Sequence, residues 1–545
     1  MKKLIYYTLA IAATALSMTS CLGDLDTVPL NETDKTGETA YQNIQDFQRG
    51  LAYIYGSFSL SSQNDPGTAD INVDDAGQSE FIRQIVVLNE MSTDAMKCIW
   101  GDSYITETQT ASWTAGGNAA LVATYTRGLI TVTRANEFLT RATGREMDGL
   151  PGLIAEARFL RAYAYFVLMD LYGNPPFATE ENIGGGSLPT QIGRPALFAW
   201  IESELKALAD PNSAMPNVGE VPYPRATKGS AQALLARLYL NAEVYTGTPR
   251  WEDARTAAEK VIGMGYGLCS NYAHLFLQDN GENPDAQKEM IFAIGYDSNQ
   301  MQSWGGTTHL VSGSVHDAAS QAIAKELGFG DNTFMSPERW NGYHIPNEYV
   351  EANFEMKNVS WGGTGIGYDR EGSDKRAFFC NTGCEKEFDL KVAETGWRCW
   401  KFNSMDSQNQ LHLDNNFSSA DFPVIRLAEM YLIYAEAQAR LDNGITTDAK
   451  ALGYIKQLRD RAGLDTPASI DLDFILKERA CELMMEGHRR TDLIRYGYFT
   501  SMSFPWPYKG GVPTGAVEIP AYRTIFPLLD NDVAENSNLT QNPGY

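Results

Sequence analysis

The chain has 545 residues, of which 43% are apolar and 11% aromatic, so it can bury a large hydrophobic core. Its 44 basic and 68 acidic residues give a formal net charge of −24 at pH 7. Because nucleic acids and anionic membrane surfaces bind basic faces, this charge argues against both as partners. Length alone favours about three domains.

The start of the chain has the pattern of a secretory signal. Two lysines follow the first methionine, and an apolar run from Leu4 to Met18 comes next that is too short to span a bilayer. A cysteine lies just beyond it. The sequence therefore predicts a signal peptide at residues 1–20 and lipid attachment at Cys21, with ordinary signal cleavage as the alternative. No later segment has about 18 uncharged apolar residues, so we expect the lipid alone to hold the mature chain at a membrane.

Helical periodicity marks the first half of the chain. Apolar residues recur there every three or four positions, which is typical of amphipathic helices. Alanines in the last two of these helices allow close backbone approach, as in tetratricopeptide-like helix pairs. The predicted helical ranges are 41–58, 119–141, 151–172, 226–245 and 249–263.

Residues 424–499 contain three further helix patterns in a row. Asn443-Gly444 and Gly463 end the first two, because these residues tolerate the left-handed conformation that closes a helix. Asp471 is the predicted N-cap of the third. The sequence thus predicts a mainly all-α fold in which this stretch is a scaffold.

The third of these helices is predicted to carry Glu478, Glu482 and Glu486, spaced by four residues. Like charges at that spacing repel by about 0.2–0.5 kcal/mol per pair, so they need cationic partners. We expect an ion-pair lattice between helices; a catalytic carboxylate cluster, or a metal site with His488, is the alternative. The arginines nearby in sequence are Arg479, Arg489, Arg490 and Arg495.

Several separated blocks, in the same order, resemble the SusD/RagB family, the outer-membrane nutrient-binding lipoproteins of Bacteroidetes. They are LGDLDTVP after Cys21, EARFLRAYAYFVLMDLYGNPPF, IRLAEMYLIYAEAQ, ERACELMMEGHRRTDLIRYG and the final LTQNPGY. The resemblance implies a SusD-like scaffold of tetratricopeptide-like helix pairs with long irregular ligand-binding loops. It also implies a lipid-anchored protein at the cell surface that captures an oligosaccharide and delivers it to a TonB-dependent, SusC-like transporter.

Two long irregular regions interrupt the helices, at 59–118 and 264–422. Both are rich in Gly, Asn, Asp, Ser and aromatic residues, and irregular segments of such length usually carry function. On the family pattern we divide the mature chain into an N-terminal region at 21–263 and a C-terminal region at 264–545. We expect the two to form one intertwined globular unit, with the ligand bound in the irregular regions.

The sequence holds no recognisable catalytic motif. It has no Gly-x-Ser-x-Gly, no phosphate-binding loop and no His-Glu-x-x-His, and its six histidines are scattered. We therefore expect no enzymatic activity, no cofactor and no metal. A pair of carboxylates that hydrolyses glycosides is an open alternative, because such a pair is recognised only by its spacing in three dimensions.

The cysteines fall into two groups. Cys380, Cys384 and Cys399 lie close together, and a local disulfide among them is expected in an exported protein, with the pairing open. Zinc would need a fourth ligand, and none is evident. The scattered three are expected to be buried as small apolar residues: Cys98, Cys269 and Cys481.

The irregular regions also place aromatic residues in polar surroundings. A flat ring can cover the apolar C–H face of a sugar at low entropic cost, while polar side chains bind its hydroxyl groups. Glycine pairs follow two of the tryptophans and are expected to give those rings clearance. Core packing is the alternative for each candidate. The candidates from composition are Trp304, Trp340, Tyr343 and Trp361.

One further candidate comes from the family resemblance. The segment NEMSTDAMKCIWGD at 89–102 resembles a loop in which many members carry a ligand-contacting tryptophan followed by an acid or amide. This implies that Trp100 and Asp102 contact a bound glycan, although Ala95 stands where an acid is usual and the spacing to the tryptophan is shorter. The alternatives are oligopeptide capture, as in the RagB branch, and a helical-repeat scaffold that binds another protein.

Overall fold

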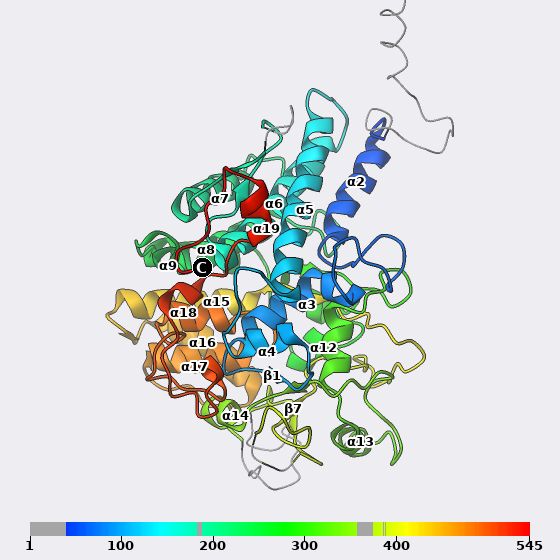
Figure 1. The fold of residues 1–545 in the computed structure, drawn as a ribbon, viewed down its shortest axis with the longest axis vertical. Helices are drawn as coiled ribbons and strands as arrows, with labels where there is room; N and C mark the ends of the chain where they lie inside the picture. The colour runs from blue at the N-terminus through cyan, green and yellow to red at the C-terminus, as the bar shows by residue number, and fades with distance from the viewer. Residues whose placement is uncertain (1–39, 183–187, 357–373, 385, 387) are drawn as a thin grey trace, which may run out of the picture.

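The structure, a computed structural model, is mainly helical with short strands (Figure 1). The predicted signal peptide, Cys21 and Trp361 lie outside the described residues. Among the residues described, no helix combines the length and the apolar composition that a membrane crossing requires. The structure describes residues 40–182, 188–356, 374–384, 386 and 388–545.

The N-terminal half is a series of helices that pack on one another in chain order. They are α2 (Ile44–Gly56), α5 (Ala119–Ala142), α6 (Leu150–Tyr172), α7 (Arg194–Ala209), α8 (Lys228–Leu240), α9 (Ala242–Thr246) and α10 (Trp251–Ile262). Helix α5 packs against α6, α6 against α7, α7 against α8 and α8 against α10. Each predicted helical range contains a helix. Helix α7 is missing from the prediction, although Leu197, Ile201, Leu205 and Leu208 mark its buried stripe.

The C-terminal stretch continues this stack. Its helices are α15 (Leu427–Leu441), α16 (Ala449–Ala462), α17 (Leu472–Leu483) and α18 (Arg489–Arg495). Helix α15 packs against α10, α16 and α17, which joins the two halves of the chain. The predicted helix ends are confirmed: Asn443, Gly444 and Gly463 have φ of 59°, 104° and 78°. Asp471 is also confirmed as an N-cap, because its Oδ1 accepts the Phe474 N–H at 2.8 Å.

The two irregular regions contain more helix than expected. The first holds η1 (Ala76–Ser79), α3 (Phe81–Val86), the π-helix η2 (Val87–Met91) and α4 (Ser103–Gln109). The second holds η3 (Tyr272–Phe276), α11 (Pro284–Gln287), α12 (Gly306–Ser314), α13 (Asp317–Glu326) and α14 (Asn347–Asn353). Most of these are too short to show a periodic apolar face in the sequence. The last segment of the chain adds η4 (Lys509–Gly511), η5 (Ala521–Thr524) and α19 (Asp530–Glu535).

The strands form two-stranded antiparallel pairs that join distant segments. Strand β1 (Lys97–Cys98) pairs with β5 (Tyr343–His344), β4 (Met290–Ile294) with β8 (Phe422–Arg426), and β6 (Phe379–Cys380) with β7 (Arg398–Cys399). The other pairs are β2 (Pro176–Phe177) with β3 (Thr190–Gln191) and β9 (Ile445–Thr446) with β10 (Ile470–Asp471). The pair β1–β5 links the two irregular regions. The mainly α-helical fold class is confirmed.

The glutamates of α17 form a buried ion-pair lattice, as predicted. Glu482 is fully buried, and its carboxylate lies 3.1 Å from Arg376 Nη1, 2.6 Å from Arg426 Nη1 and 2.5 Å from Arg461 Nη2. Burial opposes ionisation of Glu482, but these three guanidiniums outweigh it and lower its pKa well below the ordinary value. We call this set the Glu482 lattice: Glu289, Arg376, Lys401, Arg426, Arg461, Glu478, Glu482 and Glu486.

Two details of that prediction are wrong. Helix α17 ends at Leu483, so Glu486 lies beyond it, in a turn where Met485 and Gly487 have positive φ. The partners also come from distant segments, because the neighbouring arginines are already paired elsewhere. Arg479 and Arg495 bind Asp492, Arg489 binds Asp94, and Arg490 donates to backbone carbonyls.

The six cysteines among the described residues are all buried: Cys98, Cys269, Cys380, Cys384, Cys399 and Cys481. The expected burial of the scattered three is confirmed. No disulfide joins the described cysteines, so the local disulfide expected among the clustered three is not found. The register of β6 and β7 places Cys399 opposite Phe379 and Cys380 opposite Arg398, so these two cysteines do not face each other.

Candidate functional site

Three of the tryptophans selected from the sequence lie together. The ring centroids of Trp100 and Trp340 are 6.3 Å apart, and those of Trp340 and Trp304 are 6.0 Å apart. A fourth ring, Phe417, lies 4.5 Å from Trp304. All four side chains are partly exposed. We call this set the aromatic arc: Trp100, Trp304, Trp340 and Phe417.

Tyr343 lies beneath the arc. Its ring is 1% exposed and 5.7 Å from Trp100, so it supports that ring from the interior. Its Oη is hydrogen-bonded to Nδ1 of His309, a buried side chain that the sequence prediction missed. Burial, and secondarily the nearby Arg83, lower the pKa of His309 well below its ordinary value. His309 is therefore neutral and packs 5.5 Å from Trp100 and 5.8 Å from Trp340.

The strand pair β1–β5 positions Trp100. Cys98 is in register with Tyr343, and the Ile99 N–H donates to the Gly342 carbonyl at 3.1 Å. The indole Nε1–H of Trp100 donates to the Trp340 carbonyl at 3.1 Å. A Cβ on Gly342 would lie 2.3 Å from the Trp100 ring, so only glycine allows this approach.

Helix α12 positions Trp340. The backbone N–H of Trp340 donates to the Ser312 carbonyl at 2.9 Å, and the N–H of Gly342 donates to the Gly313 carbonyl at 2.8 Å. The indole N–H of Trp340 donates to Glu338 Oε2 at 3.1 Å. Hydrogen bonds thus fix both the backbone of Trp340 and the edge of its indole ring.

Trp304 comes directly before α12. The sequence analysis expected the glycine pair after Trp304 to give its ring clearance, and this expectation is wrong. A Cβ on Gly305 would lie 2.3 Å from Glu80 Cβ, and one on Gly306 would lie 2.3 Å from the Tyr296 ring. Gly306 also has φ of +52°. The two glycines therefore allow this backbone to pack directly on Glu80 and Tyr296. The corresponding pair after Trp361 lies outside the described residues.

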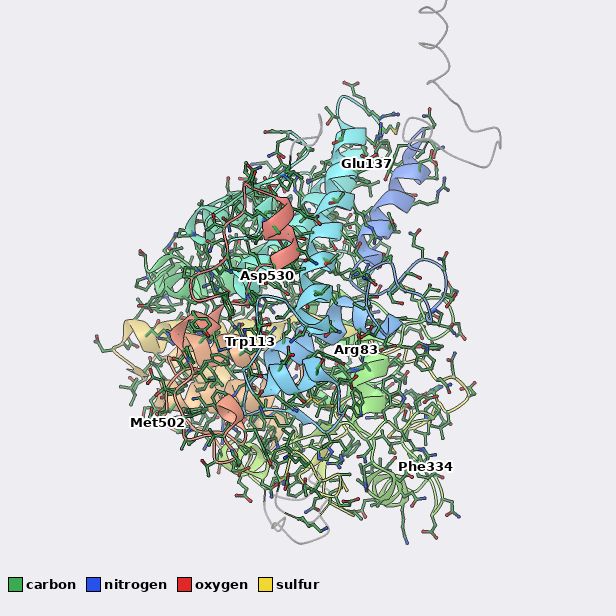
Figure 2. The ribbon with its side chains drawn as sticks, in the orientation of Figure 1. Arg83, Trp113, Glu137, Phe334, Met502 and Asp530 are labelled. Atoms are coloured by element: carbon green, nitrogen blue, oxygen red, sulfur yellow. The ribbon has the colours of Figure 1, made fainter. Side chains whose placement is uncertain are left out.

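Three acidic side chains lie on or beside the segments that carry the arc, and one of them, Glu338, contacts it. Glu338 binds the Trp340 indole, and Asp102 is an exposed residue two positions after Trp100. Asp102 occupies the N-cap position of α4 but makes no side-chain capping hydrogen bond. Asp75 ion-pairs with Arg83 at 2.7 Å, and Figure 2 shows Arg83 where α3 meets α12. These carboxylates are acceptors suited to hydroxyl donors.

The rings of the arc are inclined to one another. The planes of Trp100 and Trp340 differ by 60°, and those of Trp304 and Trp340 by 44°. An apolar cavity of about 550 Å³ lies elsewhere, beside α2, where Leu51, Tyr55 and Met301 help to line it. Within the described part of the chain, no group of three or more His, Cys, Asp or Glu side chains could hold a metal ion.

Sequence reasoning missed two aromatic members of the site. Phe417 lies in the polar run DNNFSS, so the criterion used for the tryptophans would have selected it. His309 lies in the helix GTTHLVSGS and offers no comparable signal. The contact of either residue with the tryptophans depends on segments far apart in the chain.

Comparisons with known proteins agree with this architecture. Residues 263–545, just over half of the chain, match the model of the SusD family. Residues 32–240 match a family described as starch-binding and associating with the outer membrane. The starch-binding protein SusD of Bacteroides thetaiotaomicron is 29% identical over 100% of this chain and 99% of its own. A SusD-like protein of Bacteroides ovatus is 26% identical over 63% of this chain and 58% of its own.

Solved structures share the fold. A SusD superfamily protein from Parabacteroides distasonis superposes with a TM-score of 0.67 at 17% identity, covering 93% of this chain and 100% of that chain. A laminarin-binding SusD-like protein gives 0.66 at 20% identity with the same coverage. At such identities the likeness establishes the fold alone. Together with the family match, it shows that the chain belongs to the SusD family.

Proposed function

We propose that this protein captures oligosaccharides at the cell surface on the aromatic arc. The observation that carries the proposal is the convergence of Trp100, Trp304 and Trp340 from three separate segments into one partly exposed surface. Aromatic side chains in a folded protein usually end in the core. Partly exposed neighbours bordered by carboxylates instead offer flat apolar faces for sugar rings and acceptors for their hydroxyl groups.

We further propose a curved glucan as the ligand. Successive ring planes on the arc turn by 44° and 60°, so one flat chain cannot stack on all of them at once. A starch-type α-glucan curves along its length and turns its sugar faces progressively. The starch-binding relative that matches the whole chain supports this choice, and the laminarin-binding neighbour supplies a second glucan to compare.

In this proposal Glu338 and Asp102 accept hydrogen bonds from sugar hydroxyls at the rim of the arc. Tyr343 and His309 hold the tryptophans in place from below. Binding is stacking plus a few directed hydrogen bonds, with no bond made or broken. Trp361 is a further candidate platform from outside the described residues.

Calorimetry tests the proposal. We expect the mature wild-type protein to bind maltoheptaose, with laminarin oligosaccharides and a peptide pool measured beside it. Trp304→Ala should weaken glycan binding, whereas Trp251→Ala should not, because Trp251 is a partly buried tryptophan that packs against Arg440 on the helical stack. Peptide binding without glycan binding would replace this function with oligopeptide capture. Binding of neither would favour a protein-interaction scaffold.

Anchoring and delivery complete the proposal. A lipid on Cys21 would hold the protein at the outer membrane, where a TonB-dependent, SusC-like transporter would receive the captured glycan. The family model described as associating with the outer membrane supports this location. Labelled palmitate should enter the wild type but not Cys21→Ala, and equal labelling of both would contradict lipidation. Co-purification of the lipidated protein with a TonB-dependent transporter from its native outer membrane would test the partnership.

A further inference from the structure

Glu80 joins the two segments that carry the arc. It is fully buried and comes directly before α3, where its Oε2 accepts the Arg83 N–H at 2.6 Å and so caps that helix. The same oxygen accepts the N–H of Gly306 at 2.8 Å. Gly306 is the first residue of α12, and the preceding Gly305 has no side chain with which to cap it. One carboxylate thus caps two helices that are far apart in sequence.

A third donor completes the junction. The hydroxyl of Tyr296 donates to Glu80 Oε1 at 2.5 Å. The opposing backbones also approach closely, because a Cβ on Gly77 would lie 2.7 Å from the Trp304 carbonyl oxygen. The segments around Gly77–Glu80 and Trp304–Gly306 therefore fit together only with glycine at the contact points and an acceptor at Glu80.

The flanks of this segment have other supports. Ser303 Oγ accepts the Gly305 N–H at 3.0 Å, and Thr307 Oγ1 donates to the Ala420 carbonyl at 2.7 Å. The first bond is local to the Trp304 segment, and the second ties that segment to the loop that carries Phe417. The bond from Gly306 to Glu80 ties the Trp304 segment to the segment that leads to Trp100. Glu80 thus helps to set the distance between Trp304 and Trp100.

We propose that Glu80 is a positioning residue for glycan binding, which fixes the Trp304 platform relative to Trp100 by capping α12 from the other irregular region. This rests on the proposed function of the arc. Glu80 is buried and touches no ligand itself. Its effect on affinity is therefore indirect, and we expect it to pass through the position of Trp304.

A double-mutant cycle on maltoheptaose binding tests the proposal. Glu80→Ala removes the acceptor from two buried N–H groups, and we expect about a 10-fold loss of affinity, within the loss expected for a stacking ring. In the Trp304→Ala background the same change should cause no further loss. Glu80→Gln keeps an oxygen acceptor for both N–H groups and should retain most of the affinity. Equal losses in both backgrounds would overturn the proposal.

Two variants separate positioning from general stability. Asp46→Ala removes another buried carboxylate that caps a helix, in α2, which lies in the upper part of Figure 1, whereas β1 lies in the lower half. It should lower the melting temperature and leave affinity unchanged. Tyr296→Phe removes one donor to Glu80 and should weaken binding by about 2-fold, again only when Trp304 is present. It also serves as the test if Glu80→Ala does not fold.

A measurement without ligand separates this proposal from the proposed function. Amide hydrogen exchange of the peptide that contains Trp304–His309 should become faster in Glu80→Ala than in wild type, with α16 unchanged. Faster exchange in a protein that binds no glycan would mean that the function fails while the structural role of Glu80 holds. Unchanged exchange at this peptide would overturn the positioning role, whether or not glycan binds.

Discussion

The Glu482 lattice and the aromatic arc are both assembled from segments far apart in the chain. They differ in chemistry and in exposure, because the lattice buries charged groups and the arc leaves aromatic rings partly exposed. In the lattice every carboxylate is buried and meets at least one arginine or lysine. In the arc the rings are partly exposed, rest on the buried Tyr343 and His309, and bond to one carboxylate, Glu338, and to a backbone carbonyl. Buried charge thus stabilises the scaffold of this protein, whereas the partly exposed aromatic rings are available to a ligand.

The largest effect is expected in the lattice. Glu482→Ala leaves Arg376, Arg426 and Arg461 buried without their shared carboxylate, which should destabilise the fold by about 3–5 kcal/mol. Denaturant unfolding measures the loss, and maltoheptaose affinity under folding conditions should be unchanged. Lost binding with an unchanged unfolding midpoint would show that this cluster, and not the arc, is functional.

The next effect is expected in the arc. Trp100→Ala removes one stacking ring and should weaken glycan binding by about 1–3 kcal/mol, or roughly 5- to 150-fold. The ring also packs on Tyr343 and His309, so a modest fall in melting temperature should accompany it. Calorimetry measures the glycan affinity of the variant, and its melting temperature is the control for folding. Unchanged affinity in a folded variant would make Trp100 a packing residue.

A third test compares two buried carboxylates. Burial raises the pKa of Glu90 to about 7, and the hydrogen bonds that its Oε1 accepts from the backbone N–H groups of Gly487 and His488 offset this only in part. A raised folded pKa stabilises the protein below the ordinary carboxyl pKa, and that stabilisation is lost as pH rises through about 7.

Glu90→Gln should therefore flatten the dependence of unfolding free energy on pH between about 5 and 8, an effect on the order of 1 kcal/mol. Glu482 has the opposite shift, so its contribution is lost only as pH falls below the ordinary carboxyl range. Equal slopes in wild type and Glu90→Gln would show that Glu90 does not titrate in this window.

The smallest effect is expected at an exposed ion pair. Lys456 and Asp460 lie four residues apart on α16, with side chains 62% and 56% exposed. Lys456→Ala should change stability by no more than about 0.5 kcal/mol, and less at high salt. A loss near that of Glu482→Ala would mean that burial is not what separates the lattice from surface pairs.

Part of the site was predictable from the chain alone. Trp304 and Trp340 stand out because large apolar rings in polar, glycine-rich segments are unusual. Trp100 stands out because its segment resembles a family loop, and the structure brings these three together. Tyr343 has the same local signal but is buried beneath them. Nothing local distinguishes a ring that faces solvent from one that supports it, because that depends on which strand pairs with β1.

The sequence by itself determined most of the scaffold helices, several of their ends and the family. These depend on signals within a few residues: apolar periodicity, an N-cap at Asp471 and left-handed residues such as Gly463. Only the tertiary structure decided which arginines meet Glu482 and which carboxylate caps α12. Those contacts join residues about 20 to more than 200 positions apart, and long-range pairing depends on how the helices pack rather than on local sequence.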